Sequence, residues 1–364
     1  MTVVQSLLAG PRGRRLLLAY ALAAEEQTAE SHENSLHSAV FWASRQLDVE
    51  RGTAGVLYGP GAEEATQPVV TPAQVAARVS AVALPDVTAA ALRSVLAKAA
   101  GTAYYWQEPD GDDVLIAVDP VRAALRRIAE HVAGSPHTRW WTEPLESADQ
   151  WTVGHTQPEV TEPTAVQQLQ LWRTETLTEE VRAARERPTD PAANFSGYWW
   201  SIPPTRSSTR TLFDGTPAGL WFVEDGMDPE SVVTTKTSVP GSAHVYEIDS
   251  AHAWAELCRR FPLEVTAQKR HDWYRTTGRA GRWVLPDWSQ TAEHYDGVHL
   301  TVAGYLAAAG TAIDVDDETA SVIAGWAPGE TYWFTDAVGS AGDPVTWRPD
   351  NSRDETVWTR EIEP

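Results

Sequence analysis

The sequence predicts an α+β fold, in which a helix-rich N-terminal domain is followed by a mostly antiparallel, Trp-rich α+β domain. As far as about residue 150, apolar residues recur with the period of an amphipathic helix. From Asn194 onwards, short runs of β-branched and aromatic residues alternate with Gly, Pro and Asp, which is typical of strands and turns. Fifteen of the seventeen Trp residues lie at or after position 140. A chain of 364 residues can bury a core in each of two such domains.

The N-terminal domain is predicted to be built from helices. Segments with helical apolar spacing are residues 16–26, 35–47, 71–82, 89–100 and 121–132. The pairs Thr71-Pro72 and Asp119-Pro120 are good helix starts, because a Pro in the first turn gives up an N–H that has no partner there. Two short apolar runs, residues 55–58 and 114–118, are candidates for strands.

A polar, Pro-punctuated stretch divides the chain. Residues 153–164 have no periodicity and predict a linker or surface loop, and residues 165–187 predict a charged helix that stops before Pro188. The predicted organisation is a helix-rich domain over residues 1–152, a linker and connecting helix over 153–193, and an α+β domain with the candidate site over 194–364.

The C-terminal domain is predicted to alternate strands with two helices. The expected strands are residues 198–202, 219–223, 242–248, 321–326 and 331–334. The helices are expected over residues 251–261, with Ser250 as N-cap, and over residues 302–309, with Thr301 as N-cap.

The charge of the chain limits its partners. Acidic residues outnumber basic ones fifty to twenty-nine, for a formal net charge of −21. This charge repels phosphate backbones and anionic lipid, so we expect a small-molecule or protein substrate, with no nucleic acid and no membrane as partner. The single cysteine, Cys258, excludes an internal disulfide and a multi-cysteine zinc site. Nothing in the sequence indicates an oligomeric state.

The composition predicts a cytoplasmic protein. Secretion is the alternative, because Arg14 and Arg15 precede an apolar run with small residues, so that residues 12–24 resemble a signal peptide. Apolar residues also occur before the arginines, as at Val3 and Leu7, and this favours the first amphipathic helix of a folded domain. The apolar run is too short to span a bilayer.

Two histidines raise the question of a metal site. His32 and His37 are five positions apart, which sets them about 140° apart around a helix, whereas a zinc-binding helix needs a spacing of about four. The remaining His, Asp and Glu residues do not have the spacing of metal ligands either. We therefore predict no metal.

Functional groups are most concentrated in residues 283–305, which contain two Trp, two His, two Tyr, two Asp and a Glu. Surface loops and apolar cores do not ordinarily collect so many ionisable and aromatic side chains, so we expect the functional site here. His294 or His299 could act as a general base near neutral pH. His299 is the better candidate, because Asp296 precedes it by three residues.

The segment Tyr295-Asp-Gly-Val-His-Leu-Thr-Val-Ala-Gly-Tyr305 resembles the last block of the SGNH (GDSL-type) esterases. In that block an Asp and a His three residues apart precede a helix and form two members of a Ser-His-Asp triad. Asp296 and His299 match the spacing, and the resemblance implies an esterase or hydrolase. The chain lacks Gly-Asp-Ser, and its only Asp-Ser pair, Asp249-Ser250, lies far from the chain start, so no nucleophile is assigned.

The C-terminal half also resembles the NAD-dependent ADP-ribosyltransferase fold, through the order of several short segments. Gly219-Leu-Trp-Phe-Val is similar to the Gly-aromatic-Phe strand of that family, and His244-Val-Tyr-Glu-Ile to a later strand. Tyr295-Asp-Gly-Val resembles its Tyr-Asp-Gly turn, and Glu330-Thr-Tyr-Trp-Phe its closing strand with a nearby catalytic acid. Ser207-Ser208-Thr209 is loosely similar to its Ser-Thr-Ser strand.

This second resemblance implies NAD as the ligand. Cleavage of the nicotinamide–ribose bond develops positive charge on the sugar, which a carboxylate stabilises, while an Arg holds the pyrophosphate and an aromatic ring stacks on the nicotinamide. Glu330 is the implied catalytic acid, and His299 and Asp296 are further catalytic candidates. The candidates for binding NAD are Arg206, Arg210, Trp199, Trp200, Trp221 and Tyr295.

We predict an ADP-ribosyltransferase-like protein that binds an NAD-like nucleotide, because this resemblance accounts for the order of four segments and the esterase resemblance for one. A third class is a non-catalytic, Trp-rich binding protein that recognises a sugar or peptide or neutralises a toxin, with the helical half as partner surface. Trp suits such a role because it offers a flat apolar face and one N–H donor.

Overall fold

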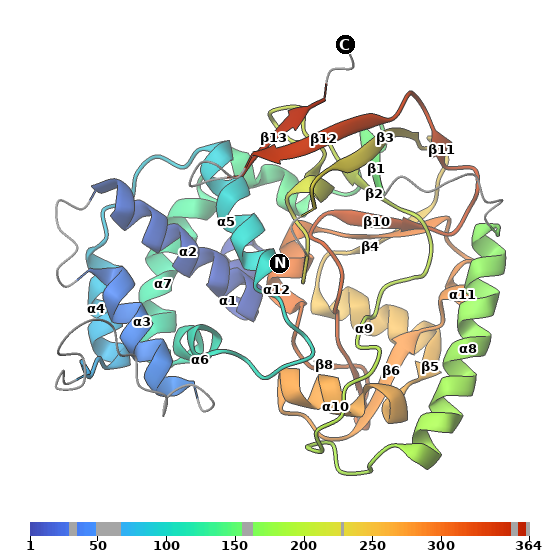
Figure 1. Ribbon diagram of the computed structural model, residues 1–364, viewed down its shortest axis with the longest axis horizontal. Coiled ribbons are helices and arrows are strands. Elements are labelled where there is room, and N and C mark those ends of the chain that lie inside the picture. Colours follow the sequence, from blue (N-terminus) through green and yellow to red (C-terminus); the bar gives the residue numbers. More distant parts are fainter. Residues whose placement is uncertain (29–34, 49–66, 155–162, 227–228, 351–355, 362–364) are drawn as a thin grey trace.

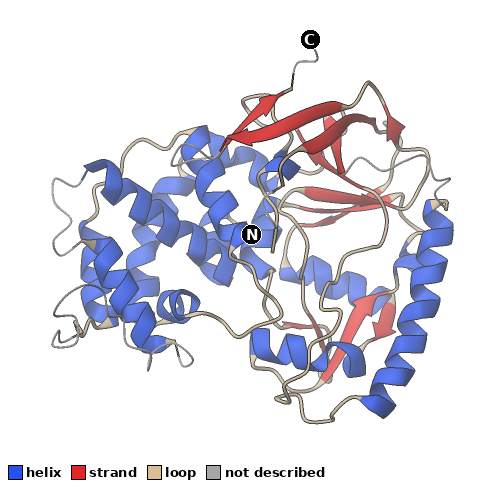
Figure 2. Ribbon diagram, in the orientation of Figure 1, coloured by secondary structure: helices blue, strands red, loops and turns tan. Residues whose placement is uncertain are grey.

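The computed structural model describes residues 1–28, 35–48, 67–154, 163–226, 229–350 and 356–361. A helical part occupies one side of the molecule, and a part that contains the strands and the remaining helices occupies the other (Figure 1). Figure 2 shows this division directly, since the strands are drawn only on the second side. The predicted α+β class is confirmed.

The helices predicted from apolar spacing in the N-terminal half are confirmed. Thr71 caps α4 in a reciprocal pair of bonds, because its Oγ1 accepts from the Gln74 N–H while the Gln74 side chain accepts from the Thr71 N–H. The described helices of this half are α1 (Val3–Ala9), α2 (Pro11–Thr28), α3 (Leu36–Leu47), α4 (Pro72–Ala81), α5 (Ala89–Gly101), α6 (Gly111–Ala117), α7 (Asp119–Ala133) and the 3₁₀ helix η2 (Pro136–Thr142).

The strand predicted over residues 114–118 is wrong, because this segment belongs to α6. The Asp110 carboxylate accepts a hydrogen bond from the Asp113 N–H and caps the helix. Leu115 and Ile116 are buried on its inner side, and a short apolar run of this kind looks the same in a strand and in a buried helix. The other candidate strand, residues 55–58, lies outside the described residues.

A cluster of charged side chains joins α2 to α6. Arg12 forms a buried salt bridge of 2.7 Å with Asp113. Arg15 pairs with Asp110, with Asp112 at 2.6 Å and with Asp113 at 3.3 Å. The segment that resembles a signal peptide therefore forms a helix here, and two of its arginines bind inside the fold. None of the described helices is both long enough and apolar enough to cross a membrane.

The second part is built on a large sheet, which has nine strands among the described residues. Eight of them follow the order β13-β12-β3-β1-β2-β10-β7-β4, and β11 pairs with β3. The strands are β1 (Gln150–Gly154), β2 (Ser207–Arg210), β3 (Val232–Ser238), β4 (Val245–Ile248), β7 (Gly297–Leu300), β10 (Glu330–Trp333), β11 (Gly339–Ser340), β12 (Val345–Asp350) and β13 (Val357–Arg360).

A smaller sheet has the order β5-β6-β9-β8. Its strands are β5 (Pro262–Glu264), β6 (Arg282–Pro286), β8 (Ile313–Asp314) and β9 (Thr319–Ser321). Across both sheets, the pairs β4–β7 and β6–β9 are parallel and the other described pairs are antiparallel. The prediction of a mostly antiparallel domain is confirmed.

Helices surround the two sheets, and α8 runs along the outer edge of the second part (Figure 1). The helices expected after Ser250 and Thr301 are confirmed, and both residues cap them as predicted. The described helices of this part are α8 (Ala165–Glu186), the 3₁₀ helix η3 (Ala218–Leu220), α9 (Ala251–Arg260), α10 (Thr266–Thr277), α11 (Trp288–Thr291) and α12 (Val302–Ala308).

The strand predictions are confirmed only in part. Most of residues 331–334 lie in β10, and the last part of residues 242–248 forms β4. Of residues 321–326, only the first belongs to a strand, as the last residue of β9. Residues 219–223 are not a strand, because Pro217 begins the 3₁₀ turn η3. Residues 198–202 are an irregular segment held by tertiary hydrogen bonds, such as the one from the Ser201 N–H to the Ala324 carbonyl.

One hydrophobic core runs through both parts. Helix α1 packs against α12, and Gly10 lies at their contact, where a Cβ atom would stand 2.5 Å from the Leu306 carbonyl oxygen. Strand β1 belongs to the large sheet, although its first residues precede the predicted boundary at residues 152–153. The division into separate domains stays a prediction.

Candidate functional site

A cavity of about 260 Å³ lies on one face of β1, β2 and β10. Successive strand residues point to opposite faces of a sheet, so alternate residues of the three strands line the cavity floor. Trp151 is opposite Thr209, and Thr209 is opposite Glu330, which aligns these three side chains in one row across the strands. The next row contains Ser207 and Tyr332.

The cavity is closed by segments from elsewhere in the chain. They are the irregular segment that carries Trp200, the turn from Gly219 to Glu224, and the loop from Gly325 to Ala327. Gly325 has φ +78°, and a Cβ atom there would stand 2.1 Å from Cδ1 of Trp200. The close approach of these two walls therefore requires glycine.

Glu330 is the acidic group on the cavity floor. Its Oε2 accepts a hydrogen bond of 3.2 Å from the Ala327 N–H. Burial raises the pKa of Glu330, while hydrogen bonds from Ser207, Ala327 and Tyr332 act in the opposite direction. The carboxylate is thus fixed in position and partly withdrawn from water, which strengthens its effect on any positive charge that forms beside it.

A second carboxyl group, Glu224, lines the same cavity. Its Oε1 accepts a hydrogen bond of 2.7 Å from the Tyr105 hydroxyl, whereas Oε2 has no hydrogen-bond partner among the described residues. Burial raises the pKa of Glu224 to about 7, against the effect of nearby tyrosine hydroxyls and the charge of Arg12. Burial therefore favours the protonated form of Glu224, whose Oε2 atom is itself buried.

We expect Glu224→Gln to change how stability depends on pH. The pKa of Glu224 is raised in the folded state, so folding favours the protonated form, and its contribution to stability is lost as pH rises from about 4.5 to about 7. At pH 4 the variant should be close to the wild type, and at pH 8 it should be more stable by about 1–3 kcal/mol, since a tenfold change in proton affinity corresponds to about 1.4 kcal/mol.

Urea unfolding at the two pH values measures this difference. The matched control is Glu293→Gln, at an exposed position outside the cavity, which should leave the pH dependence unchanged. If Glu224→Gln stabilises the protein equally at both pH values, the pKa of Glu224 is not raised in the folded state.

The segment that carries Trp200 is held by a buried lysine. Lys269 on α10 donates hydrogen bonds to the Tyr198 carbonyl at 2.6 Å and the Trp200 carbonyl at 2.7 Å. Its side chain is 2% exposed, and burial lowers the pKa of Lys269 to about 7. The lysine therefore acts as a structural donor behind the cavity wall.

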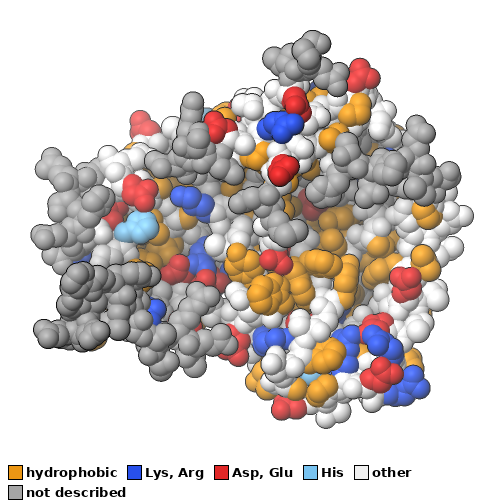
Figure 3. All heavy atoms as spheres, in the orientation of Figure 1, with side chains coloured by type: hydrophobic (Ala, Val, Ile, Leu, Met, Phe, Trp, Pro, Cys, Tyr) orange, Lys and Arg blue, Asp and Glu red, His pale blue; other side chains and the backbone are white. Residues whose placement is uncertain are grey.

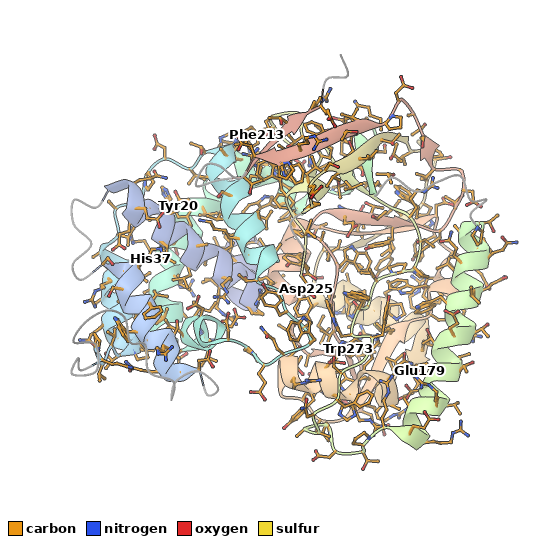
Figure 4. The ribbon with its side chains drawn as sticks, viewed as in Figure 1. Tyr20, His37, Glu179, Phe213, Asp225 and Trp273 are labelled. Carbon is orange, nitrogen blue, oxygen red and sulfur yellow. The ribbon has the colours of Figure 1, made fainter. Side chains whose placement is uncertain are left out.

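Exposed hydrophobic side chains lie on and near the segments that close the cavity, and two of them, Trp200 and Val223, line it. Figure 3 shows hydrophobic side chains gathered near the centre of this face, where the two parts of the molecule meet. Figure 4 places Asp225, the neighbour of Glu224, at the same junction, and Trp106 donates a hydrogen bond of 3.3 Å to its carboxylate. The exposed large hydrophobic residues of these segments are Tyr104, Trp106, Tyr198, Trp200 and Val223.

The structure brings only some of the predicted site residues into this cavity. Glu330 and Trp200 line it. Trp199 is buried behind Trp200 and its carbonyl accepts a hydrogen bond from the Trp273 side chain. The indole of Trp221 lies 3.6 Å below the Arg93 guanidinium, outside the cavity lining.

Asp296 and His299 are not partners. The Nδ1 atom of His299 lies 2.6 Å from Oε2 of Glu247 on the neighbouring strand β4. The Asp296 carboxylate instead accepts a hydrogen bond of 2.8 Å from the His244 backbone N–H. The expected orientation of His299 by Asp296 is therefore wrong, because His299 lies on a strand and its acidic neighbour comes from the adjacent strand.

Thr331 on β10 is the cross-strand neighbour of His299, but the cavity beside His299 offers no nucleophile. The small cavity beside it, of about 10 Å³, has no Ser, Thr or Cys among its lining residues. Tyr295 lies in another cluster, where its hydroxyl accepts a hydrogen bond of 2.6 Å from Arg260 and its ring packs on Tyr246. The esterase interpretation thus gains no support from this geometry.

Neither candidate arginine lines the cavity that contains Glu330. Arg206 lines a separate cavity of about 930 Å³ beside Thr164 and Asp336. Arg210 lies at the end of β2 with its guanidinium 4.7 Å from the Trp140 ring centre. Both residues alternate with Ser207 and Thr209 along β2, so their side chains point away from the cavity floor.

Sequence reasoning missed Glu224 and Lys269. Glu224 directly follows the apolar segment 219–223, and a carboxyl at the end of an apolar run was the only signal for it. Lys269 lies among polar residues of α10 and had no signal in the sequence.

Among the described residues, no group of three or more His, Cys, Asp and Glu side chains is arranged to hold a metal ion. His37 pairs with Glu26 at the surface, and His32 lies outside the described residues.

Comparison of the chain with protein-family models, with curated proteins and with solved structures found no match.

Proposed function

We propose that this protein binds the nicotinamide-ribose end of an NAD-like nucleotide in the cavity on β1, β2 and β10 and cleaves its N-glycosidic bond. One observation carries the proposal. Glu330 and the segment Ser207–Thr209, two pieces of the resemblance to the ADP-ribosyltransferase fold, pair across neighbouring strands and line one cavity with Trp200.

The chemistry of the lining residues suits this reaction. When the bond between ribose and nicotinamide breaks, its electron pair leaves with the nicotinamide and positive charge develops on the sugar. A fixed carboxylate at Glu330 stabilises that charge, and Trp200 offers a ring face for stacking. Water or an acceptor group then bonds to the sugar carbon and gives up its proton. The raised pKa of Glu224 limits a second negative charge beside the cavity.

The size of the cavity limits what it encloses. Sites for drug-sized ligands measure roughly 300–1,000 Å³, and this cavity of about 260 Å³ lies just below that range. It therefore suits the nicotinamide-ribose end rather than a whole dinucleotide. Since Arg206 and Arg210 do not line it, the proposal assigns no contact to the pyrophosphate.

We expect Glu330→Gln to lower the rate of NAD hydrolysis or transfer by about 10²–10³-fold, the scale for loss of one electrostatic contact to a transition state. Release of nicotinamide, followed by chromatography, measures the rate. Gln keeps the size of the side chain and one acceptor oxygen but removes the charge, and the melting temperature of the variant checks its folding.

Glu293→Gln is the control and should retain full activity, because Glu293 is exposed and does not line the cavity. Binding is tested separately through quenching of Trp fluorescence by NAD and by nicotinamide riboside. The proposal fails if millimolar NAD neither quenches the fluorescence nor raises the melting temperature of the wild type, or if Glu330→Gln turns over NAD normally.

A non-catalytic binding protein is the second candidate. The exposed ring of Trp200 in the cavity lining favours it, because flat aromatic faces bind sugars and peptide side chains without any catalytic group. Binding of a ligand that depends on Trp200 but is unaffected by Glu330→Gln, in a protein without NAD turnover, would support this alternative.

A further inference from the structure

A second cavity lies where α5 and η2 meet the end of β2. Its volume is about 390 Å³, within the range of small-molecule sites. Helix α5 supplies Arg93 and apolar residues, η2 supplies Trp140 and Trp141, and β2 with its following turn supplies Arg210 and Phe213. Figure 4 shows Phe213 beside α5, at the junction of the two parts.

The charge of this cavity is opposite to that of the whole chain. The protein carries a formal net charge of −21, but the cavity lining contains two arginines and a histidine, Arg93, Arg210 and His137, and no Asp or Glu. The Arg93 guanidinium already has partners within the protein, because it pairs with Asp214 and stacks on the Trp221 ring at 3.6 Å.

Arg210 is the group that can bind a ligand. Its guanidinium lies 4.7 Å from the centre of the Trp140 ring, and no hydrogen bond or salt bridge to another described residue engages it. The carboxylates of Glu143, Glu146 and Asp149 favour its charge from a distance, while burial lowers the pKa of Arg210. A half-buried guanidinium with unused donors favours an anion that accepts them in pairs.

The rest of the lining favours a planar ring. The half-buried Trp140 and the exposed Phe213 contribute accessible aromatic surface to the same cavity, and the buried rings of Trp141 and Phe222 complete its lining. Rings of this kind bind a flat heterocycle by stacking, and the volume leaves room for a ring together with a charged group. An anion the size of a single benzene ring would fill only a small part of this cavity.

We propose that this second cavity binds a mononucleotide, with its base among the aromatic rings and its phosphate on Arg210. The proposal does not depend on the reaction at Glu330. Phe222 lines both cavities, so they adjoin each other, but Arg210 lines only the second of the two and Glu330 only the first, and variants of these residues test the two sites separately in the full-length chain.

The experiment measures binding of AMP to the full-length protein by isothermal titration calorimetry, with adenosine and inorganic phosphate as separate probes. We expect AMP to bind more tightly than either probe, because only AMP engages both the rings and the arginine. Arg210→Gln should weaken AMP binding by about ten- to a hundred-fold, the usual scale for a lost charged hydrogen bond, and leave adenosine binding almost unchanged.

Matched variants keep the result interpretable. Arg206→Gln lies on the same strand but lines a different cavity, and Glu330→Gln lies in the first cavity, so both should bind AMP normally. Arg210→Lys keeps the charge and should recover only part of the affinity, because a lysine lacks the paired donors of a guanidinium. Melting temperatures of all variants confirm that they fold.

Three results obtained with the wild type or with Arg210→Gln would overturn the proposal. They are absence of AMP binding at millimolar concentration, equal affinity for AMP and inorganic phosphate, and AMP binding that Arg210→Gln leaves intact. Loss of AMP binding in Glu330→Gln would assign the nucleotide to the first cavity and would likewise contradict a separate site.

Discussion

Replacement of Arg15 by Met should lower the free energy of unfolding by about 3–5 kcal/mol, the range for removal of one partner from a buried ion pair. Arg15 is 6% exposed and pairs with Asp110, Asp112 and Asp113 at the start of α6. Without the guanidinium, these carboxylates repel one another at the contact between α2 and α6. Urea unfolding followed by far-UV circular dichroism measures the change.

The matched control is Arg122→Met. Arg122 forms a salt bridge of 2.6 Å with Asp119, but both side chains are largely exposed, and exposed pairs contribute less than about 1 kcal/mol. Adding Asp110→Asn and Asp112→Asn to Arg15→Met should restore part of the lost stability, because it removes the repulsion. An effect of Arg15→Met no larger than that of the control would contradict a role for the cluster in joining the two helices.

Replacement of Trp326 by Ala should cost about 3–5 kcal/mol, the range for deletion of a large buried aromatic side chain. The Trp326 ring is fully buried and packs against the rings of Trp254, Trp288 and Tyr332 at 5.1–6.1 Å. Its Nε1 also donates a hydrogen bond of 3.2 Å to the carbonyl of Glu330. The substitution should therefore also reduce the proposed NAD turnover, because it releases the backbone that positions this carboxylate.

Trp106→Ala is the control for Trp326→Ala, because it removes the same side-chain volume at an exposed position. Trp106 is 38% exposed, so its removal leaves no enclosed void, and we expect a cost below about 1.5 kcal/mol, well under the range for a buried ring. If the free energy of unfolding falls with urea concentration at the same slope as in the wild type, both variants alter the stability of the protein rather than the compactness of its unfolded state. Equal costs for the two substitutions would mean that the aromatic cluster around Trp326 does not form a tightly packed core.

The helices were predictable because their signals are local. Thr71, Ser250 and Thr301 each accept a hydrogen bond from a backbone N–H three residues later, so a cap and an apolar stripe lie within one short segment. Helix α10 was not predicted, because such a local signal is missing from its sequence. Its buried face includes Lys269 and Asp272, which give no apolar stripe.

The polar face of α10 depends on partners from another segment. Asp272 accepts hydrogen bonds from the Ser196 hydroxyl and the Gly197 N–H, and Lys269 donates to the Tyr198 carbonyl. Burial of such groups is tolerated only when they are hydrogen-bonded. Because these partners lie about seventy residues earlier in the chain, no window of sequence around α10 could indicate its burial.

The strands and the candidate site depended more strongly on tertiary context. The apolar segment at Gly219 has the composition of a strand, yet Pro217 and the packing of Phe222 turn it into a 3₁₀ helix at the cavity wall. The spacing of Asp296 and His299 suggested a pair, yet strand geometry directs His299 to Glu247 on β4. Spacing along a chain predicts contact only when the local conformation is already known.

By itself the sequence determined the α+β class and most of the helices, because composition, caps and apolar spacing act over a few residues, while Glu330 and Trp200 became candidates through the resemblance to the ADP-ribosyltransferase fold. The tertiary structure alone decided which groups share a cavity. It joined Tyr105 to Glu224 across 119 positions of the chain, and it separated Arg210 from Glu330 by the alternation of side chains on β2. Such pairings follow from strand register and from burial, which are set by the whole fold.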